Sequence, residues 1–338
     1  MKFIELFAGI GGFRYGLENI GYEATYRQET AEGVRKVVSR PKLNNVQGTI
    51  FSCVYANEFN KYAASIYERH YEKPDTRDIR EVKETEIPEH DLLTAGFPCQ
   101  SFSVAGKRGG FRDTRGTLFF QIARIAKQKQ PRLLLLENVK GLLSHDKGKT
   151  FGTILNTLDE LGYDCQWQVL NSKDFGVPQN RERVFIVGHL RGTSRPEVFP
   201  IVGTNEKALE QLVGGSQGMR VYSDKVSTTI AGLAGGWGAK TGLYAIPVLT
   251  PDRPIKRQNG RRFKEDGEPS FTLTGQDKHG VFDGAKIRRL APTECERLQG
   301  FPDGWTEGIS DTQRYKCLGN AVTTNVITAI GKRLLSFS

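Results

Sequence analysis

One of the five cysteines, Cys99, stands where a reactive thiol would be expected. It follows the apolar stretch Leu92–Gly96 in the order Gly96-Phe97-Pro98-Cys99, and a polar, glycine-rich stretch comes next, at 105–110. Most free cysteines in proteins are small buried hydrophobic residues. A thiolate on a loop beside basic residues is instead the reactive kind. Pro98 and the polar stretch favour the second interpretation, so Cys99 is a candidate nucleophile.

Two other segments carry groups suited to acid–base work. Glu137 comes near the end of the very apolar stretch Arg132–Val139, where a carboxyl group could donate a proton. Arg181 and Arg183 precede a further apolar stretch, and such a pair of guanidinium groups can bind a phosphate or orient a carboxylate. These residues complete a candidate catalytic set with Cys99.

A glycine-rich turn near the start of the chain indicates a bound cofactor. The residues Phe7-Ala-Gly-Ile-Gly-Gly-Phe13 follow a strand-like stretch and open a helix, and glycines there let the backbone approach a ligand. Dinucleotide enzymes share such turns. Glu58 could accept hydrogen bonds from a ribose, and Phe59 could stack on a purine. We expect Asp78-Ile79 to end a third strand, where the carboxylate could accept from an adenine amino group. An adenosine-containing cofactor fits all three segments, although each acid alone is equally explained as an ordinary loop residue.

The elements that must position these residues alternate along the first 190 residues. Apolar runs predict strands, and helical spacing of apolar residues predicts the helices between them. The expected strands are 4–7, 54–56, 92–96, 132–139, 166–170 and 184–188, and the expected helices are 11–21, 61–71, 118–129 and 151–161. This alternation predicts an α/β fold with a doubly wound, mostly parallel, Rossmann-like sheet, in which ligands bind at the carboxyl ends of the strands.

The composition changes after about residue 190. Residues 191–286 hold 15 of the 38 glycines, and helical periodicity fades there. We expect a second, smaller domain rich in strands and loops, because aromatic residues are available for its core. Helical spacing returns at 293–298 and 322–335, and we expect this last stretch to pack back on the first domain. A polar segment at 24–51 reads as an insertion, either a solvated loop or a nucleic-acid contact.

Composition sets the class of partner. The net charge is +10 and the pI about 9.3, which makes a polyanion a candidate partner and a merely basic surface the alternative. The basic stretch from Arg253 to Lys264 predicts phosphate contacts by Arg257 and Arg261. The cysteines are scattered, without a Cys-x-x-Cys pair, so we expect neither disulfides nor a metal site. Scattered cysteines also suit a reducing cytoplasm, and without an apolar run of about 20 residues or a signal peptide we expect no membrane segment.

Taken in order, these motifs resemble the DNA (cytosine-5)-methyltransferases, chiefly the bacterial modification enzymes. The resemblance covers nearly the whole chain. It rests on Phe-Ala-Gly-Ile-Gly-Gly-Phe-Arg, Asn-Glu, Gly-Phe-Pro-Cys-Gln-Ser-Phe-Ser, Glu-Asn-Val, Gln-Asn-Arg-Glu-Arg, the stretch 288–302 and Gly319-Asn-Ala-Val322. It implies transfer of a methyl group from S-adenosylmethionine to C5 of a flipped-out cytosine in duplex DNA, through a covalent adduct with Cys99. S-adenosylhomocysteine would be the product.

The resemblance also implies roles for named residues. The catalytic residues would be Cys99, Glu137, Arg181 and Arg183; Arg183 would contact O2 of the base, and Arg181 would hold Glu137 or a phosphate. The cofactor would be bound by Phe7, Gly9, Ile10, Gly11, Asn57, Glu58, Phe59, Asp78, Ile79, Pro98, Leu118, Asn320 and Val322. DNA would be contacted by Gln100, Ser101, Ser103, Lys107, Arg108, Arg257, Arg261 and Thr272.

The implied domains are a catalytic and cofactor-binding domain at 1–190 plus 319–338, a target-recognition domain at 191–286 and a connecting segment at 287–318. We expect a monomer that works either beside a restriction endonuclease or as an orphan modification enzyme. Three other interpretations differ in class. An RNA methyltransferase would use the same catalytic set, but the Cys-Phe-Thr element of the tRNA-methylating branch is missing from 191–286. A non-catalytic DNA-binding protein would not need an intact set, and a NAD-type oxidoreductase would not need Pro98-Cys99.

Overall fold

The computed structural model describes residues 1–20, 50–98, 118–194, 197–203, 211–213, 221–222, 243–244, 246–251, 261–265, 268–275, 278–282 and 287–335. The chain divides into two compact units. Unit 1 comprises Met1–Leu170, Arg183–Ile201 and Val326–Ser338, and unit 2 comprises Asn171–Glu182 and Val202–Asn325. The two units are defined by how densely their residues contact one another, whereas the domains predicted above are defined by their roles. The predicted domain boundaries therefore stay a prediction.

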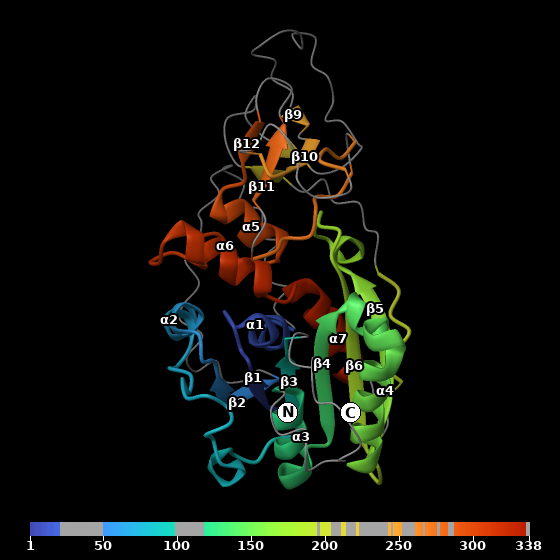
Figure 1. Cartoon of the computed structure of the whole chain (residues 1–338). Helices are drawn as coiled ribbons and strands as arrows, with labels where there is room; N and C mark the ends of the chain where they lie inside the picture. The colour runs from blue at the N-terminus through green and yellow to red at the C-terminus, as the bar shows by residue number, and fades with distance from the viewer. Residues whose placement is uncertain are drawn as a thin grey trace, which may run out of the picture. The chain divides into compact units, whose positions relative to one another are not determined.

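A six-stranded sheet forms the centre of unit 1 (Figure 1). Its order is β2-β1-β3-β4-β6-β5. The strands are β1 (Lys2–Leu6), β2 (Ser52–Asn57), β3 (Leu92–Gly96), β4 (Leu133–Val139), β5 (Tyr163–Asn171) and β6 (Glu182–Leu190). Strands β2, β1, β3 and β4 pair in parallel, and β6 runs antiparallel to β4. The predicted doubly wound, mostly parallel sheet is confirmed.

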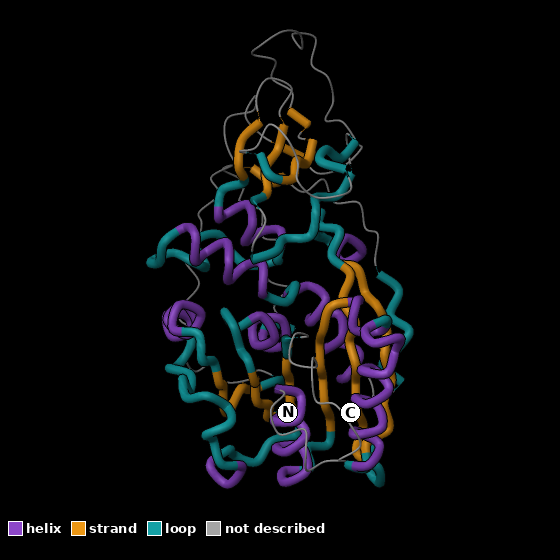
Figure 2. Tube along the Cα trace, in the orientation of Figure 1, coloured by secondary structure: helices purple, strands orange, loops and turns teal. Residues whose placement is uncertain are grey.

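Helices cover both faces of this sheet, as Figure 2 shows by the purple helices beside the orange strands. On one face, α3 (Leu118–Lys129) and α4 (Lys149–Glu160) bury their apolar stripes against strand residues such as Leu93 and Leu134. On the other face lie α1 (Gly12–Glu18), α2 (Lys61–His70) and α7 (Thr324–Leu335). Short 3₁₀ turns occur at η2 (Glu84–Glu86), η5 (Lys140–Leu143), η6 (His145–Gly148) and η7 (Ser172–Phe175).

The last helix, α7, packs on the first one, α1. The Thr328 hydroxyl donates to the carbonyl of Gly16 at 2.8 Å. A Cβ on Gly331 would lie 2.4 Å from Cδ1 of Ile20 and 2.8 Å from Cδ2 of Leu17, so the two helices approach closely at this glycine. Residues from Val326 onward therefore belong to unit 1 and pack on its first helix.

The described part of unit 2 contains two small sheets and two α-helices. Strands β10 (Ile246–Leu249), β11 (His279–Phe282) and β12 (Ile287–Arg289) form an antiparallel sheet, and β7 (Gln211–Val213), β8 (Val221–Tyr222) and β9 (Leu243–Tyr244) form the other. The helices are α5 (Pro292–Leu298) and α6 (Asp311–Asn320). Helix α6 was not predicted, because it buries only Cys317, Leu318 and Gly319 and so lacks an apolar stripe.

The expectation that Asp78-Ile79 ends a third strand is wrong. The chain makes one isolated parallel bridge, Asn57 to Asp75, and then turns. The Asp75 carboxylate accepts from the N–H of Arg77, and the Asp78 carboxylate accepts from the N–H of Arg80, both at 3.0 Å. Such local side-chain bonds compete with a strand ladder. Among the described residues, no helix is long and apolar enough to cross a membrane.

Candidate active site

Glu137 and Arg183 meet at the carboxyl end of β4. The Arg183 Nε lies 3.0 Å from Oε1 of Glu137, and both side chains are mostly buried. Antiparallel pairing explains the contact, since Val139 lies opposite Arg183 and Glu137 opposite Phe185. The two side chains are therefore diagonal neighbours on one face of the sheet. A guanidinium in this position orients the carboxylate.

The start of the segment that carries Cys99 is aligned with this ion pair. Gly96 at the end of β3 is paired with Glu137, and a Cβ on Gly96 would lie 3.4 Å from Oε2 of Glu137. The side-chain amide of Asn138, which is 2% exposed, donates to the Phe97 carbonyl at 2.7 Å. Strands β3 and β4 thus hold the chain up to Pro98 beside the carboxylate.

Several predicted site residues lie outside the described residues. They are the nucleophile Cys99 and the DNA-contact candidates Gln100, Ser101, Ser103, Lys107, Arg108 and Arg257. Leu118 begins α3 and is partly buried. The proposed insertion 24–51 also lies outside, except for Ile50 and Phe51.

The glycine-rich turn has a left-handed backbone at three of its residues. Gly9 and Gly11 have φ of 57° and 84°, and Phe7 also has a positive φ of 56°, which costs a side-chain-bearing residue energy. A Cβ on Gly11 would lie 2.7 Å from the Tyr71 ring, whereas a Cβ on Gly9 would meet nothing within 4 Å. The backbone at Gly9 is therefore open to a ligand.

Glu58 connects this turn to the end of β2. Its Oε2 accepts from the Gly9 N–H at 2.7 Å, and its Oε1 accepts from the Asn60 N–H at 2.6 Å. Burial raises the pKa of Glu58, while the two N–H donors lower it. The neighbouring Phe59 is 69% exposed, so its ring is available for stacking.

The other predicted cofactor residues of unit 1 differ in their burial and in their hydrogen-bond partners. Asn57 is 1% exposed, and its amide donates to the carbonyls of Asp75 and Arg77 at 3.0 Å, which fixes the adjacent loop. Asp78 pairs with Arg80 at 2.5 Å, and this hydrogen bond lowers the pKa of its carboxyl to about 2. Ile10 and Ile79 are buried in the core.

A buried polar network beneath the turn was missed by the sequence analysis. The fully buried Glu5 accepts from the N–H groups of Phe13 and Arg14 at the start of α1, and from the Tyr67 hydroxyl. Arg14 donates to Glu18 at 3.0 Å and to Glu72 at 2.6 Å. An acid within the apolar stretch at 2–6 was the signal in the sequence, because such a carboxyl must find buried partners.

Predicted residues of unit 2 lie in two segments. Asn320 is the last residue of α6, and Val322 follows in the turn before α7. Thr272 donates its hydroxyl to the carbonyl of Asn180. The exposed Arg261 pairs with Glu268 at 2.8 Å.

Arg181 makes contacts that differ from the predicted ones. It is 2% exposed, and its guanidinium donates to the carbonyls of Leu273, Gly319 and Ala321 at 2.8, 3.1 and 2.7 Å. These are main-chain groups of unit 2, whereas Glu137 or a phosphate was the partner expected from the resemblance.

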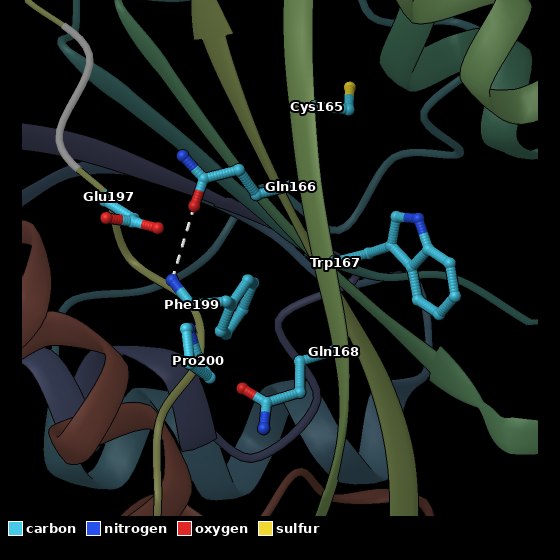
Figure 3. A pocket seen from close by; sticks show the side chains of 7 residues that line it. All are labelled: Cys165, Gln166, Trp167, Gln168, Glu197, Phe199 and Pro200. Atoms are coloured by element: carbon cyan, nitrogen blue, oxygen red, sulfur yellow. Dashed lines mark hydrogen bonds between the residues drawn. The ribbon is translucent and has the colours of Figure 1, made fainter.

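A cavity of about 670 Å³ lies elsewhere in unit 1, along strand β5. Figure 3 shows its lining, Cys165, Gln166, Trp167, Gln168, Glu197, Phe199 and Pro200. The Gln166 side chain accepts from the N–H groups of Val198 and Phe199, and Gln168 exchanges two hydrogen bonds with Ile201. These amides fasten residues 198–201 to the edge of the sheet, and none of the predicted site residues lines the cavity.

The chain is similar to known proteins over nearly its whole length. The family model for C-5 cytosine-specific DNA methylases matches residues 1–336. The chain is 34% identical to the type II methyltransferase M.HhaI of Haemophilus parahaemolyticus, over 98% of this chain and 93% of that protein. It is 38% identical to the type II methyltransferase M.SsoII of Shigella sonnei, over 99% and 80%. It is 32% identical to the orphan methyltransferase M.SPRI of Bacillus phage SPR, over 99% and 97%.

Solved structures with low sequence identity share the fold. The S. pombe Dnmt2 methyltransferase superposes with a TM-score of 0.60 at 16% identity, covering 99% of this chain and 98% of that one. The Entamoeba histolytica methyltransferase EhMeth gives a TM-score of 0.59 at 18% identity, covering 99% and 98%.

Proposed function

The chain belongs to the C-5 cytosine-specific DNA methylase family and is a DNA cytosine-C5 methyltransferase, and from that premise we propose how it works. Cys99 adds to C6 of a cytosine that has been flipped out of duplex DNA, and the methyl group comes from S-adenosylmethionine. The observation that carries this proposal is the Glu137–Arg183 pair at the carboxyl end of β4, aligned with the residues that lead to Cys99.

The chemistry explains these residue types. C5 of cytosine is a weak nucleophile, and bonding of the Cys99 thiolate to C6 moves electron density to C5 and N3. Glu137 in its protonated form is suited to hydrogen-bond or protonate N3, and Arg183 is suited to contact O2 of the base while it holds the Glu137 side chain. After C5 has taken the methyl group, a base removes the C5 proton and the Cys99 sulfur leaves, which restores the aromatic ring.

The residues around the glycine-rich turn fit an adenosine cofactor. The backbone at Gly9 is open, the Glu58 carboxylate is fixed beside it, and the Phe59 ring is exposed. When bound, S-adenosylmethionine would supply the electrophilic methyl group and leave as S-adenosylhomocysteine. Glu58 would accept from the ribose hydroxyls, and Phe59 would stack on the purine.

Substitution of Cys99 tests the chemistry. Cys99→Ser should abolish methyl transfer and leave cofactor binding nearly intact, because a hydroxyl is far less nucleophilic than a thiolate. Duplex DNA containing 5-fluorocytosine should trap a covalent adduct on the wild-type chain, since fluorine cannot leave as a proton. Turnover of Cys99→Ser within tenfold of wild type would remove Cys99 from the mechanism. Methyl transfer to tRNA rather than to duplex DNA would assign the chain to an RNA substrate.

We propose that residues 191–286 read the DNA sequence. The predicted catalytic residues lie outside this segment, so base contacts need another location. Methylation-sensitive sequencing of DNA from cells that express the chain would identify the site. A chimera carrying this segment from a relative should then methylate the relative's site, and retention of the original site would refute the assignment.

A restriction endonuclease as functional partner is the last part of the proposal. The relatives include type II methyltransferases and an orphan methyltransferase. With a partner, DNA methylated by this chain should resist cleavage by an endonuclease from the same cells, and without one no such activity should be found. The monomeric state and the cytoplasmic location stay predictions, checked by sedimentation and by cell fractionation.

A further inference from the structure

Arg181 joins two segments of unit 2 that are far apart in sequence. Its Nη1 donates to the Leu273 carbonyl, and its Nη2 donates to the carbonyls of Gly319 and Ala321. A buried guanidinium is costly unless its donors are satisfied. Its planar fork can serve several carbonyls at once, which a lysine ammonium at the same place cannot do with the same geometry.

The segment that carries Arg181 also holds Leu273 by a second side chain. Gln179 is fully buried, and its Oε1 accepts from the Leu273 N–H at 2.9 Å. Both main-chain polar groups of Leu273 are therefore bound by side chains from 179–181. Backbone bonds between Ser270 and both Pro178 and Asn180 continue the same contact. Segment 270–275 is thus bound to residues 178–181 at Ser270 and at Leu273.

The C-terminal end of α6 together with Ala321, residues 319–321, which we call the turn at 319–321, lies directly against this segment. A Cβ on Gly319 would come within 2.3 Å of the Thr274 carbonyl carbon and 2.4 Å of the Gly275 nitrogen. The two backbones touch, and only glycine leaves room for that approach. The buried Gln299 holds the other side of the turn, since its amide donates to the Leu318 carbonyl at 2.6 Å.

We propose that Arg181 is a positioning residue that ties segment 270–275 to the turn at 319–321, so that DNA binding and cofactor binding are coupled through it. Segment 270–275 contains Thr272, a predicted DNA contact, and the turn contains Asn320, a predicted cofactor contact. Displacement of either segment moves the carbonyls that Arg181 holds, and the other segment must follow. The proposal rests on the proposed function, because that function names DNA and the cofactor as the two ligands.

The test compares Arg181→Lys with the wild-type chain and with Arg183→Lys. S-adenosylhomocysteine binding is measured by titration calorimetry, without DNA and with a duplex carrying the mapped site. Arg181→Lys should weaken binding without DNA by about tenfold, as for one lost charge-assisted hydrogen bond. In Arg181→Lys, the ratio of the S-adenosylhomocysteine affinities with and without DNA should move from its wild-type value toward one. Arg183→Lys should lower kcat and leave the DNA-free affinity within about twofold.

A second pair of variants tests the contact without touching a charge. Gly319→Ala should reproduce the loss of coupling, because its Cβ would push segment 270–275 away. Gly152→Ala in α4, where a Cβ meets nothing within 4 Å, is the matched control and should behave as the wild-type chain.

Three results would overturn the proposal. They are a wild-type affinity that DNA leaves unchanged, wild-type coupling in Arg181→Lys, and a lower melting temperature in Arg181→Lys with no change in the affinity of the folded chain. If no methylation site can be mapped, the proposed function fails, and the DNA-free affinity still decides whether Arg181 positions the turn.

Discussion

The buried carboxyl of Glu5 should make the stability of unit 1 fall as pH rises. Burial raises the pKa of Glu5 from 4.5 to about 8, against the opposing effects of Arg14 and of the N–H groups at the start of α1. Between these two values the folded chain holds a proton that the unfolded chain has lost. Unfolding releases that proton, so the free energy of unfolding falls as pH rises through this range.

The size of the effect follows from the shift. A rise from 4.5 to about 8, at about 1.36 kcal/mol per pKa unit, corresponds to about 5 kcal/mol between pH 4.5 and 8. Glu18 and Glu58 also have raised pKa values and act in the same direction. The contribution of Glu5 is therefore the difference between the wild-type chain and Glu5→Gln. The glutamine carbonyl can accept the same N–H groups, but it does not titrate.

The assay must report on unit 1 alone. The wild-type chain and Glu5→Gln are each equilibrated in urea at pH 5, 6, 7 and 8. A brief hydrogen-exchange pulse at a common pH then labels the amides of the unfolded molecules. Mass spectrometry of peptides from β1 and α1 then gives the free energy of unfolding. The wild-type value should fall by up to about 1.36 kcal/mol per pH unit more steeply than that of Glu5→Gln. Glu81→Gln, at an exposed position, should match the wild-type slope. Parallel curves for the wild-type chain and Glu5→Gln would refute the reasoning.

Three other substitutions have expected outcomes. Glu58→Gln places an amide donor against the N–H group of Gly9 or of Asn60. Binding of S-adenosylhomocysteine, measured by calorimetry, should therefore weaken by about tenfold or more, whereas Glu68→Gln at an exposed position should leave it unchanged. Gly331→Val should destabilise the chain by about 1 to 3 kcal/mol in urea unfolding, because α7 packs tightly on Ile20, whereas Gly152→Val should stay within about 0.5 kcal/mol. Neutralising Arg257 and Arg261 together should flatten the log–log salt dependence of DNA binding by about 1 to 2 units on target and non-target DNA alike, and an unchanged slope would rule out phosphate contacts.

The sheet was predictable because central strands such as β3 and β4 are nearly continuous apolar runs. Residues 133–136 are four leucines, and such a run in an alternating βαβ pattern has few other interpretations. The turn at 7–11 was predictable for a different reason, since its glycines Gly9 and Gly11 allow the positive φ that a tight turn needs. Glu137 followed from its place near the end of a buried strand.

Contacts between segments that are distant in the sequence could not be predicted from the spacing of residues. Arg181 and Arg183 are two residues apart and were expected to act together. Arg183 lies within β6 and pairs with Glu137, whereas Arg181 precedes the strand and reaches carbonyls about 90 and 140 positions later in the chain. The partners of Glu5 likewise come from α1 and α2. Helix α6 was missed because a helix that buries only three residues leaves no apolar period.

The contact between α7 and α1 has a consequence for synthesis of the chain. The Thr328 hydroxyl bonds the carbonyl of Gly16, which left the ribosome 312 residues earlier. At about 5 to 20 residues per second, α1 waits roughly 15 to 60 s for its partner. During that time Leu17 and Ile20 lack the cover that α7 gives them in the folded chain. The nascent protein therefore leaves Leu17 and Ile20 uncovered from the time α1 is made until α7 is made.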